Sequence, residues 1–271
     1  DAPRALGRDP PAGGRPPGVA PANATPDASG TDRRRASRAR RSRAAGRTRR
    51  RATRRAPGAS TTPRRARAPC AVHAALKVCL QPGDTTLVIG AGSVGLFTVA
   101  ALRQLTPAGR IICVAKHERQ RREAIRLGAD EVVHPKETYT TLPALLNTRT
   151  YKPELGKPIV MGGAAQVFEC VGSPGTMEDA VRLAKPGGRV SLVGMPGARS
   201  SLDLTALWYK EVSLSGTYAY GVEEYEGETT SSFDLALRIA PEIGLEKMVG
   251  PRFRLEEYRE AVAAARSAGW A

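Results

Sequence analysis

Short runs of apolar and β-branched residues alternate with amphipathic stretches between about residues 85 and 217. Runs of this kind are typical of strands that are buried on both faces of a parallel sheet. In the stretch 93–105, Val94, Phe97, Ala101 and Leu105 repeat at the spacing of one helix face. The pattern predicts strands at 85–89, 110–115, 131–134, 166–171, 189–193 and 211–217.

Helices are predicted between these strands, at 93–105, at 118–127, near 142–147, and from Met177 to Ala184. Such an alternation implies right-handed crossovers, and therefore an α/β fold with a doubly wound, parallel, six-stranded sheet. After the last strand, helical spacing returns at 231–243 and 255–268. We accordingly separate a sheet domain at 70–220 from a C-terminal helical part at 221–271.

The first predicted strand ends in Gly90-Ala91-Gly92-Ser93-Val94-Gly95, which is a G-x-G-x-x-G pattern. Between a strand and a helix, this pattern is typical of a dinucleotide-binding Rossmann fold. Gly90 allows the tight turn, Gly92 lets a diphosphate approach the backbone, and Gly95 lets the helix pack on the strand. The N–H groups of Ser93 and Val94 would face the phosphates. The alternative is a tight turn without a ligand.

The residue that contacts the adenosine ribose is expected about 20 residues after this loop, at the end of the second strand. That position is Ala115, which offers no carboxylate to a 2′-hydroxyl, and it is followed by the cation Lys116. A cation here suits a 2′-phosphate, so the sequence favours NADP over NAD. The alternative for the neighbouring basic residues His117, Arg119, Arg121 and Arg122 is a solvated helix face.

The formal charge of +16 is concentrated in one segment of the chain. Residues 1–69 contain 19 arginines and 4 aspartates, hence +15, and almost no apolar residue larger than alanine. Such a segment cannot offset the entropy of ordering, so we expect it to be disordered. The 4 scattered cysteines predict no disulfide framework. With no apolar run of membrane-spanning length, the sequence is typical of a soluble, cytoplasmic protein.

Residues 70–268 resemble the medium-chain, zinc-type alcohol dehydrogenase family. The matching motifs, in order, are Ala71-Val72-His73, Pro82-Gly83-Asp84, the glycine loop, Leu127-Gly128-Ala129-Asp130, Phe168-Glu169-Cys170-Val171-Gly172, Lys185-Pro186-Gly187-Gly188-Arg189, Val193-Gly194 and Phe253-Arg254-Leu255-Glu256-Glu257-Tyr258. The resemblance implies an NADP- or NAD-dependent oxidoreductase that transfers hydride between an alcohol or carbonyl and nicotinamide. It also suggests a homodimer formed through strands such as 211–217.

By the same resemblance, the diphosphate lies over Gly92, Ser93 and Val94. The nicotinamide end is contacted, mostly by backbone, by loops that contain Cys170, Val171, Gly172, Val193, Gly194, Met195 and Thr217. The simpler interpretation of Cys170 is a small buried apolar residue.

In this family a separate N-terminal domain supplies the ligands of a catalytic zinc. Residues 1–69 contain no histidine or cysteine, and the region where the family has a third ligand reads Arg64-Arg65-Ala66-Arg67, which repels a dication. We therefore expect no zinc site, assign no catalytic residue, and expect a chain that keeps the cofactor-binding half but is inactive alone. The alternatives are a non-catalytic nucleotide-binding protein, or one that binds polyanions, including nucleic acid, through its basic segment.

Overall fold

The structure is a computed structural model that describes residues 67–154, 156–197, 199–248 and 250–267. The expectation of disorder for residues 1–66 lies outside the described residues. All described residues belong to one compact unit, Arg55–Ala271. Helix α2 begins at Arg67, so the helical structure starts before the boundary that the sequence placed after Pro69.

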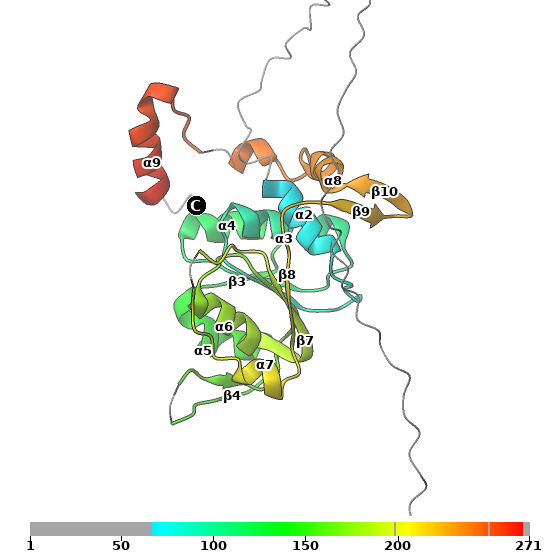
Figure 1. The fold of residues 1–271 in the computed structure, drawn as a ribbon, viewed down its shortest axis with the longest axis vertical. Helices are drawn as coiled ribbons and strands as arrows, with labels where there is room; N and C mark the ends of the chain where they lie inside the picture. Colours follow the sequence, from blue (N-terminus) through cyan, green and yellow to red (C-terminus); the bar gives the residue numbers. More distant parts are fainter. Residues whose placement is uncertain (1–66, 155, 198, 249, 268–271) are drawn as a thin grey trace, which may run out of the picture. The chain divides into compact units, whose positions relative to one another are not determined.

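A parallel sheet in the order β3-β2-β1-β6-β7-β8 forms the centre of this unit (Figure 1). The six predicted strands are confirmed, as β1 Thr86–Ile89, β2 Ile111–Val114, β3 Glu131–Val133, β6 Ala164–Glu169, β7 Ala184–Leu192 and β8 Ser213–Gly216. The strand order reverses between β1 and β6. In a doubly wound sheet, ligands bind at the carboxyl ends of the strands that flank such a reversal.

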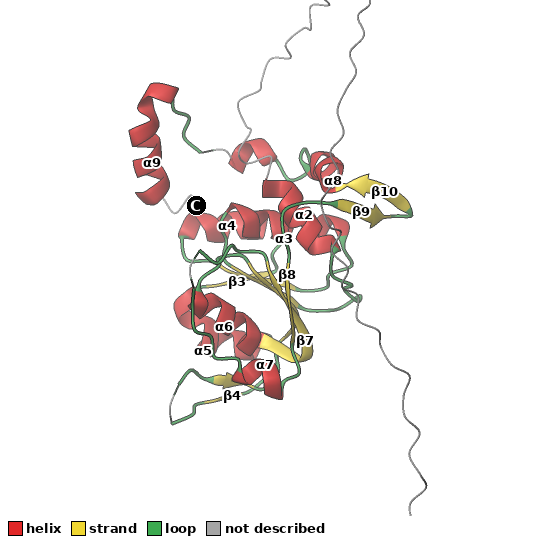
Figure 2. Ribbon diagram, in the orientation of Figure 1, coloured by secondary structure: helices red, strands yellow, loops and turns green. Residues whose placement is uncertain are grey.

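Helices cover both faces of the sheet (Figure 2). One face carries α2 Arg67–Leu76, α3 Ser93–Leu105, α4 Glu118–Arg126 and α8 Ser232–Ile239, and the other carries α5 Thr138–Leu145, α6 Pro174–Leu183 and α7 Thr205–Tyr209. Val88 belongs to the first core and its neighbour Leu87 to the second, because successive side chains of a strand point to opposite faces. Both are fully buried.

Helix α3 has the bounds that the apolar spacing predicted. It ends at Leu105, and the Thr106 hydroxyl donates to the carbonyl of Leu102, 2.6 Å away. Helix α5 instead begins at Thr138, four residues before the predicted start at 142, and it contains Pro143. A 3-10 turn, η1 Pro135–Glu137, leads into α5, and the Thr138 hydroxyl bonds to the carbonyl of Pro135.

Two small hairpins and the 3-10 turn η2 Leu245–Met248 lie outside the predicted elements. The hairpins are β4 Thr150–Tyr151 with β5 Ile159–Val160, and β9 Val222–Tyr225 with β10 Glu228–Ser231. The helix predicted at 255–268 is present as the 3-10 turn η3 Leu255–Glu257, which leads into α9 Tyr258–Ser267. The C-terminal part therefore adds a hairpin to the predicted helices. Its helix α8 buries Leu235 and Ile239 in the same core as α2 and α3.

A buried lysine stabilises the irregular start of β7. The ammonium group of Lys210 donates to the carbonyls of Gly162, Arg182 and Ala184 at 3.1, 2.6 and 2.7 Å. Burial lowers the pKa of Lys210 to about 8. The three carbonyls are the compensation that makes a cation tolerable at 2% exposure.

A polar cluster joins the C-terminal hairpin to α2. Oε1 of Glu223, a side chain that is only 7% exposed, lies 2.8 Å from Nδ1 of His73 and accepts a bond from the Ser232 hydroxyl. The Ser232 hydroxyl oxygen in turn accepts from the N–H of Gly221 at 2.8 Å. One carboxylate thus connects β9, α8 and α2.

We expect Glu223→Ala to lower the free energy of unfolding by about 1 to 3 kcal/mol, because His73 and Ser232 would lose their common partner. Chemical denaturation of the full chain measures this difference. The matched control is Glu224→Ala on the exposed face of the same strand, with an expected change of at most about 0.5 kcal/mol. Equal effects of the two substitutions would contradict the role assigned to the cluster.

Candidate functional site

The glycine loop connects the end of β1 to the start of α3. The N–H of Gly90 donates to the carbonyl of Val114 in β2, at 3.0 Å, which fixes the loop against the neighbouring strand. Gly90 has φ +97°, a conformation that favours glycine. Gly92 is the N-cap of α3 and makes no side-chain capping bond. The first-turn N–H groups of α3 therefore lack a side-chain cap, which suits them to an anion.

Gly95 allows the backbones of α3 and the loop to come together. A Cβ at Gly95 would lie 1.8 Å from the carbonyl oxygen of Gly90, and a Cβ at Gly90 would lie 2.4 Å from Cγ2 of Val171. Neither distance is possible for a real side chain without movement of the backbone or of Val171. This geometry agrees with the packing role that the sequence predicted for Gly95.

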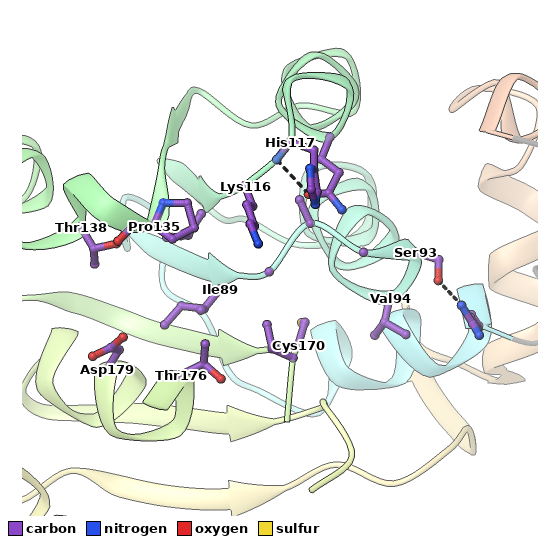
Figure 3. Close-up of a pocket in the computed structure, with 17 residues that line it drawn as sticks. Ile89, Ser93, Val94, Lys116, His117, Pro135, Thr138, Cys170, Thr176 and Asp179 are labelled. Carbon is purple, nitrogen blue, oxygen red and sulfur yellow. Dashed lines mark hydrogen bonds between the residues drawn. The ribbon is translucent and has the colours of Figure 1, made fainter. Parts of the chain in front are cut away.

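A cavity of about 460 Å³ opens at this loop (Figure 3). Its lining includes these residues from the predicted site: Gly90, Gly92, Ser93, Val94, Lys116, Cys170 and Val171. Six further residues that line the cavity were not assigned to the site from the sequence: Arg67, Gln120, Pro135, Thr138, Thr176 and Asp179. The cavity thus extends from the glycine loop past β2 to the start of α5 and to α6.

The end of β2 supplies the cationic part of the cavity. Ala115 is buried at 1% exposure, and its N–H bonds to the carbonyl of Val133, so it supports the wall without lining it. Lys116 points into the cavity (Figure 3). Within the described residues, no carboxylate forms an ion pair with Lys116, whereas Arg121 and Arg122 each lie 3.7 Å from Glu118. Those two arginines fit the solvated helix face that the sequence left as the alternative.

The loops expected at the nicotinamide end are tightly packed against one another. The side chain of Glu169 accepts from the N–H groups of Val171 and Gly172, and its carbonyl accepts from Val193 and Gly194. A Cβ at Gly194 would lie 2.4 Å from the nitrogen of Gly172. The carboxyl ends of β6 and β7 are therefore held together through one residue, whose structural role the sequence reasoning did not identify.

Several residues predicted for the site lie outside the cavity lining. They are Gly95, Ala115, Gly172, Val193, Gly194, Met195 and Thr217. Met195 is 83% exposed. The hydroxyl oxygen of Thr217 is buried and, among the described residues, has no hydrogen-bond partner, while the N–H of Thr217 bonds to Leu192. These positions flank the cavity at the same edge of the sheet.

Cys170 lies between the glycine loop and α3. Its Sγ is 3.9 Å from the Thr98 hydroxyl, and burial raises the pKa of the thiol, which keeps it protonated. Burial likewise raises the pKa of Cys113 to about 12. Both thiols pack as apolar groups, in line with the simpler interpretation of Cys170. In the described residues, no group of three or more His, Cys, Asp or Glu side chains is arranged to hold a metal ion.

Known proteins resemble the chain in both sequence and fold. The family described as zinc-binding dehydrogenase matches residues 93–233, just over half of the chain. Sorbitol dehydrogenase of Arabidopsis thaliana is 32% identical over 155 residues, which cover 55% of this chain and 39% of that protein. L-threonine 3-dehydrogenase of Ruegeria pomeroyi is 26% identical over 202 residues, which cover 73% of this chain and 52% of that protein.

A solved structure from Sinorhizobium meliloti 1021, described as a zinc-binding dehydrogenase bound to NADP, has a TM-score of 0.50 and 24% identity. The match covers 66% of this chain and 48% of that one. The chain thus spans about half the length, or less, of these relatives. Among the described residues, no helix combines the length and apolar character that a membrane span requires.

We expect Gly95→Ala to lower the free energy of unfolding by about 1 to 3 kcal/mol or more, because the new methyl group collides with the Gly90 carbonyl. Thermal or chemical denaturation of the full chain is the measurement. Gly175→Ala in the first turn of α6 is the control, since a Cβ there meets no atom within 4 Å. A Gly95→Ala protein as stable as the control would refute the close packing.

Proposed function

Because the chain belongs to the zinc-binding dehydrogenase family of oxidoreductases, we propose that it binds a nicotinamide dinucleotide in the cavity at the glycine loop, and NADP in preference to NAD. The activity that goes with this site is hydride transfer between an alcohol or carbonyl compound and nicotinamide. The observation that carries the proposal is the uncapped start of α3, which opens onto a cavity that also holds Lys116.

The chain's own residues have distinct tasks in this proposal. The N–H groups of Ser93 and Val94 bind the diphosphate, and the positive end of the α3 dipole favours its charge. Val171 and Cys170 form an apolar wall beneath the dinucleotide. Backbone groups of Gly172, Val193, Gly194 and Met195, together with Thr217, border the nicotinamide. The Thr217 hydroxyl has no partner among the described residues and is suited to a hydrogen bond from or to the cofactor.

The preference for NADP rests on the end of β2. A ribose with a free 2′-hydroxyl is best held by a carboxylate at this point, whereas Ala115 has none. Lys116 offers an ammonium group, within the cavity, to a 2′-phosphate. The Sinorhizobium relative was itself solved with NADP.

Zinc supplies a Lewis acid to the substrate oxygen where a dehydrogenase holds it next to the nicotinamide. The described residues of this chain offer no set of three ligands, so we derive no step that depends on the metal. We propose that the chain binds its cofactor but does not oxidise alcohols by itself. The alternative of polyanion binding concerns residues 1–69, nearly all outside the described part, and the homodimer also stays a prediction.

Titration of the full chain with NADPH and with NADH, followed by cofactor fluorescence, tests the proposal. We expect saturable binding of both, tighter for NADPH. When an alcohol is added to the complex of the chain with NADP, no absorbance of reduced cofactor should appear. Failure to bind either dinucleotide would refute the proposed function, and steady turnover of an alcohol would refute only the proposed inactivity.

Lys116→Ala is expected to change the affinities for the two cofactors differently. We expect it to weaken NADPH binding about tenfold or more, since a charge-assisted contact to the 2′-phosphate is lost, and to change NADH binding less than about twofold. Arg122→Ala removes the same charge from the exposed face of α4, outside the cavity lining, and should leave the ratio of the two affinities unchanged. A parallel loss for both cofactors in Lys116→Ala would contradict the assignment.

A further inference from the structure

The start of α2 lies against the start of α3, although the two are separated by the first strand in sequence. Ala71, Ala74 and Ala75 are fully buried on the side of α2 that packs in the core with α3. Side chains this small allow two helices to approach closely. The approach brings Arg67, in the first turn of α2, to the glycine loop: its Nη1 donates to the Ser93 hydroxyl at 2.6 Å, the dashed line at Ser93 in Figure 3.

The charge of Arg67 is not neutralised in the described part of the protein. No described carboxylate forms an ion pair with it, and its residue is exposed while it lines the cavity with Gly92, Ser93 and Val94. The position is also electrostatically unfavourable, because a cation is held beside the positive end of the α3 dipole. Two groups of the same polarity that converge on a cavity are stabilised together by an anion between them.

We propose that Arg67 is a ligand of the dinucleotide diphosphate, a role that rests on the proposed function. One N–H of the guanidinium is used on Ser93, which orients the group, and its remaining donors reach the phosphate oxygens. The diphosphate is then bound on one side by the backbone N–H groups of α3 and on the other by Arg67. The basic segment thus contributes an anion ligand at the place where the family has a metal ligand region.

This role differs in a measurable way from that of Lys116. Arg67 contacts a group that NADPH, NADH and ADP have in common, whereas Lys116 contacts the 2′-phosphate that only NADPH and adenosine 2′-monophosphate carry. Loss of either residue should therefore weaken NADPH binding, whereas the two losses have opposite effects on NADH and ADP compared with adenosine 2′-monophosphate.

The experiment is isothermal titration of the full chain, as wild type, Arg67→Gln and Lys116→Ala, with these four compounds. We expect Arg67→Gln to raise the Kd of NADPH, NADH and ADP about tenfold or more, and that of adenosine 2′-monophosphate less than about twofold. Lys116→Ala should show the reverse for the two mononucleotides. Arg122→Gln, which removes an exposed guanidinium outside the cavity, should bind all four as wild type does.

Arg67→Lys keeps the charge but loses the planar fork, and we expect its ADP affinity to fall between those of wild type and Arg67→Gln. Equal unfolding temperatures of the variants would show that the fold is kept. If Arg67→Gln unfolds at a lower temperature than wild type, the comparison of Arg67→Lys with wild type is used instead. An unchanged Kd for ADP in a variant whose parent binds NADPH would overturn the role of Arg67 alone. A wild type that binds neither dinucleotide would overturn the proposed function instead.

Discussion

The rest of the site depends on the contact between two stretches of backbone, at Gly90 and Gly95. Because no Cβ separates them, α3 starts directly over the end of β1, with its free N–H groups at the edge of the sheet. The same contact sets the position of α3 along the sheet, and hence of α2 and α8, which pack in the same core. A shift of α3 by the width of a methyl group would move the first-turn N–H groups and Arg67 together.

The layer of α2, α3 and α8 is built from segments that are far apart in sequence. Alanine side chains of α2 allow close packing, and the carboxylate of Glu223 in the C-terminal hairpin contacts His73 of α2. Arg67 reaches the cavity because of the way this layer packs, and not because a loop carries it there. The C-terminal part of the chain therefore supports the proposed binding site indirectly, although none of its described residues lines the cavity.

The sequence predicted the elements whose signals are local. Buried strands and the amphipathic helix 93–105 follow from periodicity, and the glycine loop follows from its position between them. Gly90, Gly92, Ser93, Val94 and Lys116 were proposed from their positions after predicted strands, whereas Cys170 and Val171 were proposed only from the family resemblance; all seven line the cavity. Helix α5 begins earlier than the predicted start at 142, because the turn at Pro135–Glu137 leads directly into it.

Residues that reach the cavity by tertiary packing carried no such signal. Arg67 belongs to a run of arginines that composition alone assigns to solvent, and its neighbour Ser93 is 26 positions away. Thr138 and Asp179 come from two helices on the far face of the sheet, and their convergence depends on the strand order. The small hairpins were missed because their strands are mostly exposed or half-buried and show no apolar run like those of the sheet.

The double attachment of Glu169 has a consequence for how this edge of the sheet can diversify. Its carboxylate and its carbonyl hold the turns after β6 and β7 in fixed spacing, and the glycines there leave no room for an added side chain. An insertion between Glu169 and Gly172 would break the hydrogen bonds of this carboxylate, whereas Met195, after the second turn, is exposed. Substitutions at Met195 would therefore disturb the spacing of the two turns less than substitutions between Glu169 and Gly172.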